Sequence, residues 1–186
     1  MEKPILDRQI TIIGFRNVKI QNIDKFLEKF RNEDENNVIQ FFDAEYVAGR
    51  QHLFFAALNA LQAFENKANI SNNLAVETIL YASAQRQIKK AVKMLGIKKD
   101  SENLAVLIIS ENPNKINEYL TIVENMVTGQ KDDTILELTD QKFLKIKNLF
   151  EISDLELESK LWEKGQEKEA LTNLVIEHMA LLGTKS

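Results

Sequence analysis

The chain has no cysteine, which excludes disulfide bridges, zinc sites with thiolate ligands and cysteine nucleophiles. A cysteine-free chain is compatible with a reducing compartment, so we expect a cytoplasmic protein. Proline and glycine are also scarce, with two and six residues in 186, and no linker or low-complexity tract divides the chain. A chain of this length buries about 70% of the surface that its unfolded form exposes, so we expect residues 1–186 to form one domain.

Long apolar runs and catalytic signatures are missing as well. The longest notable apolar run, at 104–109, is far too short to span a bilayer, and residues 1–4 lack the apolar core of a secretory signal. The chain contains no glycine-rich phosphate loop, zinc-protease motif or serine-hydrolase elbow. His52 and His178 lie far apart, and neither has a neighbouring ligand pattern at metal spacing. We therefore expect no membrane partner, no catalytic residue, no metal and no cofactor.

Hydrophobic periodicity predicts an α+β fold: a helix-rich single domain with a small, mostly buried β-sheet. The segment 104–109 is apolar without alternation, which is typical of a strand covered on both faces. Further strands are predicted at 8–15, 38–42 and 135–138. Helices are predicted near 23–30, 49–66, the segment ending at 81, 86–96, 113–127, 143–150, 154–165 and 166–182.

The helix predicted at 86–96 carries two stripes on different faces. Its apolar stripe, expected to face the core, consists of Ile88, Ala91, Val92 and Leu95. Its basic stripe consists of Arg86, Lys89, Lys90 and Lys93. Because the whole chain has a net charge of only -4, this is a local positive field that would attract phosphate groups. A solvated helix face is the alternative interpretation of the same pattern.

The helix predicted at 166–182 has apolar residues over more than half of its circumference. A surface helix at a chain end normally hides one stripe, so the surplus favours a second protein partner. Insertion of the helix into the centre of its own domain is the other interpretation, and the pattern alone does not separate the two.

The order of three short segments resembles the kinase-binding subunit family of the KEOPS tRNA-modifying complex. These segments read H-L-F-F-A-A from His52, E-T-I-L-Y-A-S from Glu77, and R-Q-I-K-K-A from Arg86, followed by G-I from Gly96. The resemblance implies a non-catalytic, regulatory α+β subunit that supports a kinase-like ATPase. It also implies that the subunit, in archaeal complexes, holds the 3′ CCA end of tRNA while a partner transfers threonylcarbamoyl to an adenosine beside the anticodon.

Under this resemblance we assign two surfaces, each by its own residues. The predicted tRNA-binding residues are Ser83, Arg86, Gln87, Lys89, Lys90 and Lys93. The predicted kinase-interface residues are Ile152, Leu155, Leu171, Leu174, Val175, His178, Met179 and Leu182. Two alternatives remain open: a scaffold that binds protein only, and a small enzyme whose site would be a buried pocket containing His52 and a carboxylate.

Overall fold

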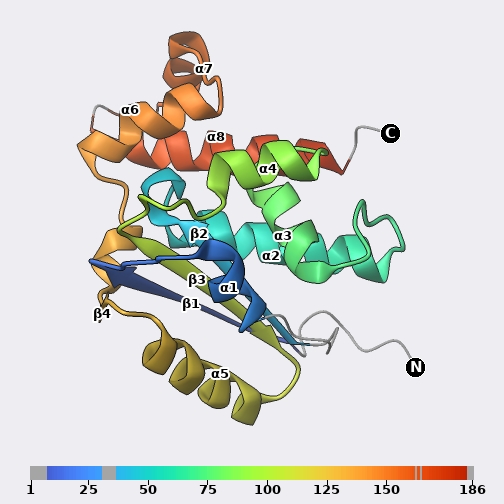
Figure 1. Cartoon of the computed structure of the whole chain (residues 1–186). Helices are drawn as coiled ribbons and strands as arrows, with labels where there is room; N and C mark the ends of the chain where they lie inside the picture. Colours follow the sequence, from blue (N-terminus) through green and yellow to red (C-terminus); the bar gives the residue numbers. More distant parts are fainter. Residues whose placement is uncertain (1–7, 31–36, 162, 164, 184–186) are drawn as a thin grey trace.

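A computed structural model describes residues 8–161, except 31–36, together with residues 163 and 165–183 (Figure 1). In chain order the elements are β1 (Gln9–Arg16), α1 (Ile23–Glu28), β2 (Asn37–Asp43), the 3-10 helix η2 (Ala44–Tyr46), α2 (Arg50–Glu65), α3 (Leu74–Ala82), α4 (Ile88–Leu95), β3 (Leu104–Ser110), α5 (Pro113–Met126), β4 (Gln130–Lys131), the 3-10 helix η3 (Asp133–Leu136), α6 (Asp140–Leu149), α7 (Asp154–Ser159) and α8 (Glu167–Leu182).

The strands form one antiparallel sheet in the order β2-β3-β1-β4. All residues of β3 are buried, since this strand has a strand on each side and helices over both faces. Val106 shows the register, because it lies opposite Ile13 of β1 and Phe41 of β2. The predicted α+β class, and the prediction of a strand covered on both faces, are confirmed.

Helices cover the sheet unequally (Figure 1). One face packs against α1 and α5, where the ring centroids of Phe30 and Phe41 are 4.7 Å apart. The other face packs against α2 and α3. Beyond α2, the helices α6, α7 and α8 add a further layer around buried residues such as Ile146 and Leu171. None of the helices in the described ranges is long and apolar enough to cross a membrane.

Local capping signals fix several helix starts. The side chains of Asn22, Asn112 and Ser153 accept hydrogen bonds from backbone N–H groups at the starts of α1, α5 and α7. At α7, Glu156 completes a capping box by accepting from the N–H of Ser153. Each bond spans only a few residues, which is why these starts were predictable.

Three sequence-based boundaries were wrong. The segment predicted as a strand at 135–138 overlaps the 3-10 helix η3, because the Asp132 side chain accepts from Thr134 N–H and starts a turn. The helix predicted at 86–96 begins only at Ile88, and α7 ends at Ser159 instead of 165.

Candidate functional site

A tight turn between α3 and α4 sets the position of the basic stripe. Ala84 has φ 52 in this turn, and its N–H donates to Tyr81 O at 2.8 Å. The turn separates α3 from α4, and Arg86, just ahead of α4, contacts Leu182 at the end of α8. No side chain caps the start of α4 at Gln87, so the first N–H groups of the helix keep a partial positive charge.

The lysines of the basic stripe are exposed and carry unbalanced charge. Lys89, Lys90 and Lys93 are exposed, and no ion pair within the described part of the chain includes any of them. Gln87 is exposed just before them. Together with the start of α4, these side chains form a positive surface suited to phosphate groups.

Ser83 does not belong to this surface, and its assignment to tRNA binding is corrected. The residue is fully buried, and its hydroxyl donates to Leu80 O at 3.1 Å. As the last position before the turn, it ends α3 instead of facing solvent.

Arg86 has a structural contact in addition to its exposed position. Its guanidinium donates to the carbonyl of Leu182 at 3.4 Å, at the end of α8. A positive charge at a helix C-terminus is favourable because the last carbonyls carry partial negative charge. Arg86 therefore joins the basic stripe to α8.

The apolar stripe of α4 is only half buried. Ala91 and Leu95 have no exposed surface, whereas Ile88 and Val92 are 48% and 47% exposed. The prediction that all four side chains face the core was wrong for Ile88 and Val92. No described element covers this side of α4, which leaves an apolar strip beside the lysines.

Most of the predicted kinase-interface residues lie inside the molecule, because α8 packs against α2, α3, α6 and α7. Those with little or no exposed surface are Ile152, Leu171, Leu174, Val175, Met179 and Leu182. Their assignment to a docking surface is corrected: the helix is inserted into its own domain, and its apolar side chains complete two of the hydrophobic clusters.

Some side chains of α7 and α8 remain exposed or partly exposed. We call Leu155, His178 and Leu181 the α7–α8 patch. Leu155 is 77% and Leu181 is 52% exposed, and His178 is partly exposed. His178 Nε2 lies 3.8 Å from a carboxylate oxygen of Glu156, which places the start of α7 beside this part of α8. Leu181 was not among the predicted residues.

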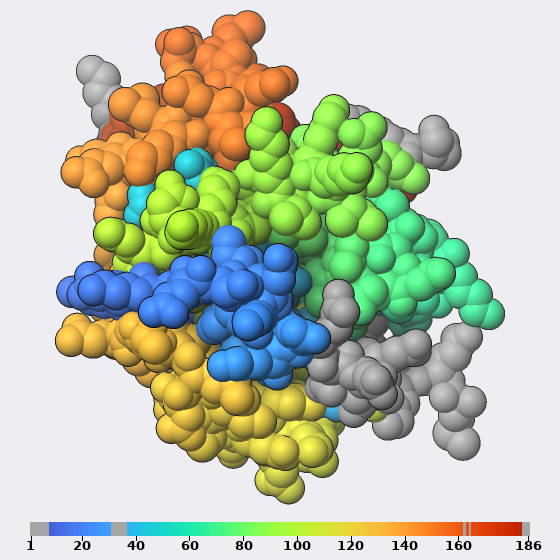
Figure 2. All heavy atoms as spheres, in the orientation of Figure 1, coloured from blue at the N-terminus to red at the C-terminus, as the bar shows by residue number. Residues whose placement is uncertain are grey.

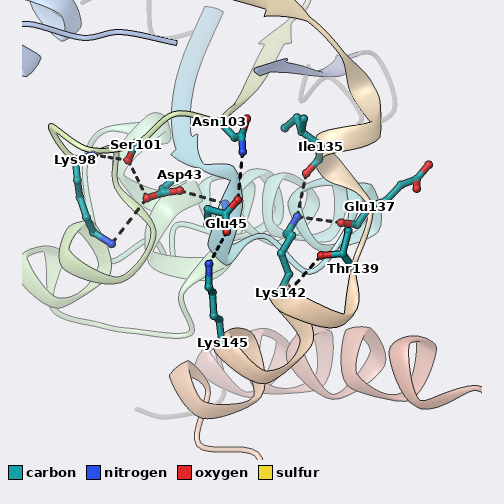
Figure 3. A network of polar contacts seen from close by, with 10 residues as sticks. All are labelled: Asp43, Glu45, Lys98, Ser101, Asn103, Ile135, Glu137, Thr139, Lys142 and Lys145. Carbon is teal, nitrogen blue, oxygen red and sulfur yellow. Dashed lines mark hydrogen bonds and ion pairs between the residues drawn. The ribbon is translucent and has the colours of Figure 1, made fainter. Parts of the chain in front are cut away.

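A buried polar network joins the sheet to the outer helices (Figure 3). Asp43, at the end of β2, accepts from the Ser101 hydroxyl at 2.8 Å, and burial raises the pKa of its carboxyl. Glu45 accepts from Lys145 of α6 at 2.7 Å, and this bond lowers the pKa of Glu45. Lys98 lies 4.1 Å from the centre of the Tyr46 ring, so this lysine is directed toward the network.

Lys142 is the most buried cation of the network. Its ammonium donates to the carbonyls of Ile135 and Glu137 at 3.0 and 3.1 Å, and burial lowers its pKa to about 8. These bonds hold α6 against the segment that precedes it. Sequence reasoning missed the network because its members come from four separate segments and have no common spacing.

His52 is also engaged in structural bonds. Its Nδ1 accepts from the N–H of Ala48 at 3.0 Å, and its Nε2 donates to the carbonyl of Ala82 at 2.7 Å. Burial lowers its pKa to about 4, so the neutral ring links α2 to the end of α3. Both hydrogen bonds of His52 are to backbone atoms and not to a carboxylate, and its ring packs edge-on against Phe150. No group of three or more potential metal-ligating side chains occurs in the described ranges.

The fold and these surfaces define a class: an α+β protein with an exposed basic helix and a separate apolar patch. Residues 15–183 match the family model of the kinase binding protein CGI-121, so the chain belongs to this family.

Two relatives illustrate the similarity. The EKC/KEOPS complex subunit CGI121 of Candida albicans is 30% identical over 171 residues, which cover 82% of this chain and 84% of the relative. The regulatory protein Cgi121 of Methanocaldococcus jannaschii is 29% identical over 113 residues, which cover 61% of this chain and 70% of the relative.

Proposed function

We propose that the chain is a non-catalytic, regulatory subunit of a cytoplasmic KEOPS-type complex that makes N6-threonylcarbamoyladenosine in tRNA. In this role it binds and supports the kinase-like ATPase and helps to recruit tRNA through the 3′ CCA end. The proposal rests mainly on membership of the kinase-binding family, whose model matches residues 15–183. The name of the Candida albicans relative as an EKC/KEOPS subunit supports the assignment to the complex.

We assign the tRNA contact to the exposed part of the predicted set: Arg86, Gln87, Lys89, Lys90 and Lys93. Lysines without an internal ion pair lose little when a phosphate approaches, and the uncapped start of α4 adds N–H donors. Gln87 offers a planar amide for the edge of an unpaired base. Because phosphate binding releases counterions, affinity should fall steeply as salt rises.

We assign the kinase contact to the α7–α8 patch. Leu155 and Leu181 present exposed apolar surface, and His178 adds a partly exposed polar group on α8. The buried residues of α8 support this surface from below, since they hold the helix against α2. A partner would therefore meet a helix surface that is already formed.

The proposal is tested by binding of intact tRNA and of the same tRNA without its 3′ CCA, at low and moderate salt. We expect tighter binding of the intact tRNA, and weaker binding by the Lys90→Glu variant. Lys25→Glu is the matched control, because it makes the same charge change at an exposed position on α1. Equal binding of both tRNAs would remove the CCA assignment. No binding at all would leave a subunit that binds protein only.

A further inference from the structure

A groove of about 780 Å³ separates α1 from α3 and α4. Figure 2 shows the blue atoms of α1 next to the green atoms of the α3–α4 region. The walls are mainly apolar and include Ile23, Leu27, Val76 and Val92. Among these residues, Leu27 and Val92 are 38% and 47% exposed, so both remain accessible at the wall of the groove.

The floor of the groove is the edge strand β2. Ala44 N–H donates to Asn103 O at 3.0 Å, which identifies this pair as hydrogen-bonded across β2 and β3. Pairs alternate along an antiparallel ladder, so Ile39 and Phe41 direct their backbone N–H and C=O groups away from β3. Within the described ranges no strand lies on that side of β2.

This edge has little protection against strand addition. Natural sheets often block an edge with lysine or proline, and β2, with the sequence N-V-I-Q-F-F-D, contains neither. The only blocking contact to the outward groups of Ile39 and Phe41 within the described chain comes from Gln40, whose side-chain amide donates to the Phe41 carbonyl at 2.8 Å. A flexible side chain can leave this carbonyl when a strand approaches.

The charge of the groove favours a peptide over a nucleic acid as its ligand. Asp24 is the only charged residue among the described lining residues. A phosphate group beside Asp24 would be repelled by its carboxylate, whereas a basic side chain would be attracted. An extended peptide can also form a regular ladder of hydrogen bonds with the outward N–H and C=O groups of β2. A nucleic acid cannot form such a ladder.

We propose that this groove binds an extended peptide segment of a protein partner, which adds to the sheet as a strand beside β2. Apolar side chains at alternate positions of the peptide fill the space between Leu27 and Val92. A basic residue of the peptide lies next to Asp24. This inference goes beyond the proposed function and does not depend on it, since neither the basic stripe nor the α7–α8 patch lies in the groove.

The test selects short random peptides, displayed on phage, against the intact protein. We expect enriched peptides with alternating apolar residues and a basic residue. In hydrogen exchange, the amides of Ile39 and Phe41 should exchange fast in the free protein, and such a peptide should slow them. Ile39→Pro removes the outward N–H without touching the bonds to β3, and an edge strand tolerates such a proline. It should weaken binding about tenfold or more, as expected for the loss of one backbone hydrogen bond.

Ile39→Val is the matched control, because it keeps the amide and should keep the binding. Val92→Glu is a second variant that leaves β2 intact, and it should weaken binding by blocking one wall. The proposal is wrong if no peptide is enriched. It is also wrong if the enriched peptides bind Ile39→Pro and Val92→Glu as tightly as they bind the original protein. Slow exchange of Ile39 in the free protein would show that the chain itself covers the edge. Protection of this amide by a CCA-ending oligonucleotide would assign the groove to RNA.

Discussion

A hydrogen bond between Arg86 and Leu182 joins the start of the basic stripe to the end of α8. The Arg86 guanidinium donates to the Leu182 carbonyl at 3.4 Å, so the first cation of the basic stripe also caps the last turn of α8. A substitution at Arg86 therefore changes both the surface charge and the attachment of α8. A substitution at one of the α4 lysines changes the surface charge alone.

We expect Arg86→Ala and Lys90→Ala to weaken tRNA binding in a salt-dependent way, but only Arg86→Ala to lower stability. The loss of an exposed hydrogen bond and a favourable helix-end charge should cost about 1 kcal/mol. Urea unfolding and tRNA titration of both variants measure the two effects. Equal stability of both variants would show that the contact with Leu182 contributes nothing.

The α7–α8 patch predicts a separation between binding and folding. Leu155→Arg and Leu181→Arg should weaken kinase binding and leave the free energy of unfolding nearly unchanged, because both side chains are largely exposed. Val175→Arg should unfold the protein, since it places a charge where no surface is exposed. Pull-down with the kinase-like ATPase and thermal unfolding measure the two quantities. Normal kinase binding by both leucine variants would move the interface elsewhere.

His52 predicts loss of stability in mild acid. The pKa of the folded ring is about 4 and the ordinary value is 6.5, so the unfolded chain takes up a proton first as pH falls. The contribution of His52 is complete above pH 6.5 and is lost as pH falls from there toward 4. Between pH 8 and 5 the expected loss is about 2 kcal/mol.

Urea unfolding at pH 8 and pH 5 tests this prediction, with His52→Gln as the comparison. Glutamine does not titrate, so the variant should lose less stability than the original protein over the same range. The same pH dependence in both proteins would assign the effect to other groups.

Lys142 and Lys145 lie on the same helix and predict unequal effects. Lys142→Ala should lower the free energy of unfolding by about 2 kcal/mol, because the buried carbonyls of Ile135 and Glu137 lose their donor. Lys145→Ala removes a half-exposed ion pair with Glu45 and should cost less than about 1 kcal/mol. Chemical unfolding of the two variants checks the order, and a larger cost at Lys145 would contradict it.

The parts of the fold that sequence reasoning predicted depend on neighbours along the chain. Asn112 caps α5 two residues ahead, and the seven residues of β3 are apolar without interruption. The wrong boundaries occur where a short turn competes with a longer element. At Asp132 a side chain bonds two residues ahead and produces a 3-10 helix in place of a strand.

By itself, the sequence determined the positions of most helices, the central strand, the family and the cluster of cations on α4, because spacing, caps and residue order are local properties. Only the tertiary structure decided which apolar stripes are covered. Met179 is buried and Val92 is half exposed, although both lie on apolar stripes of helices. The difference arises because helices distant in sequence pack over Met179, whereas no described element packs over Val92. Burial is a property of that packing and not of either helix alone.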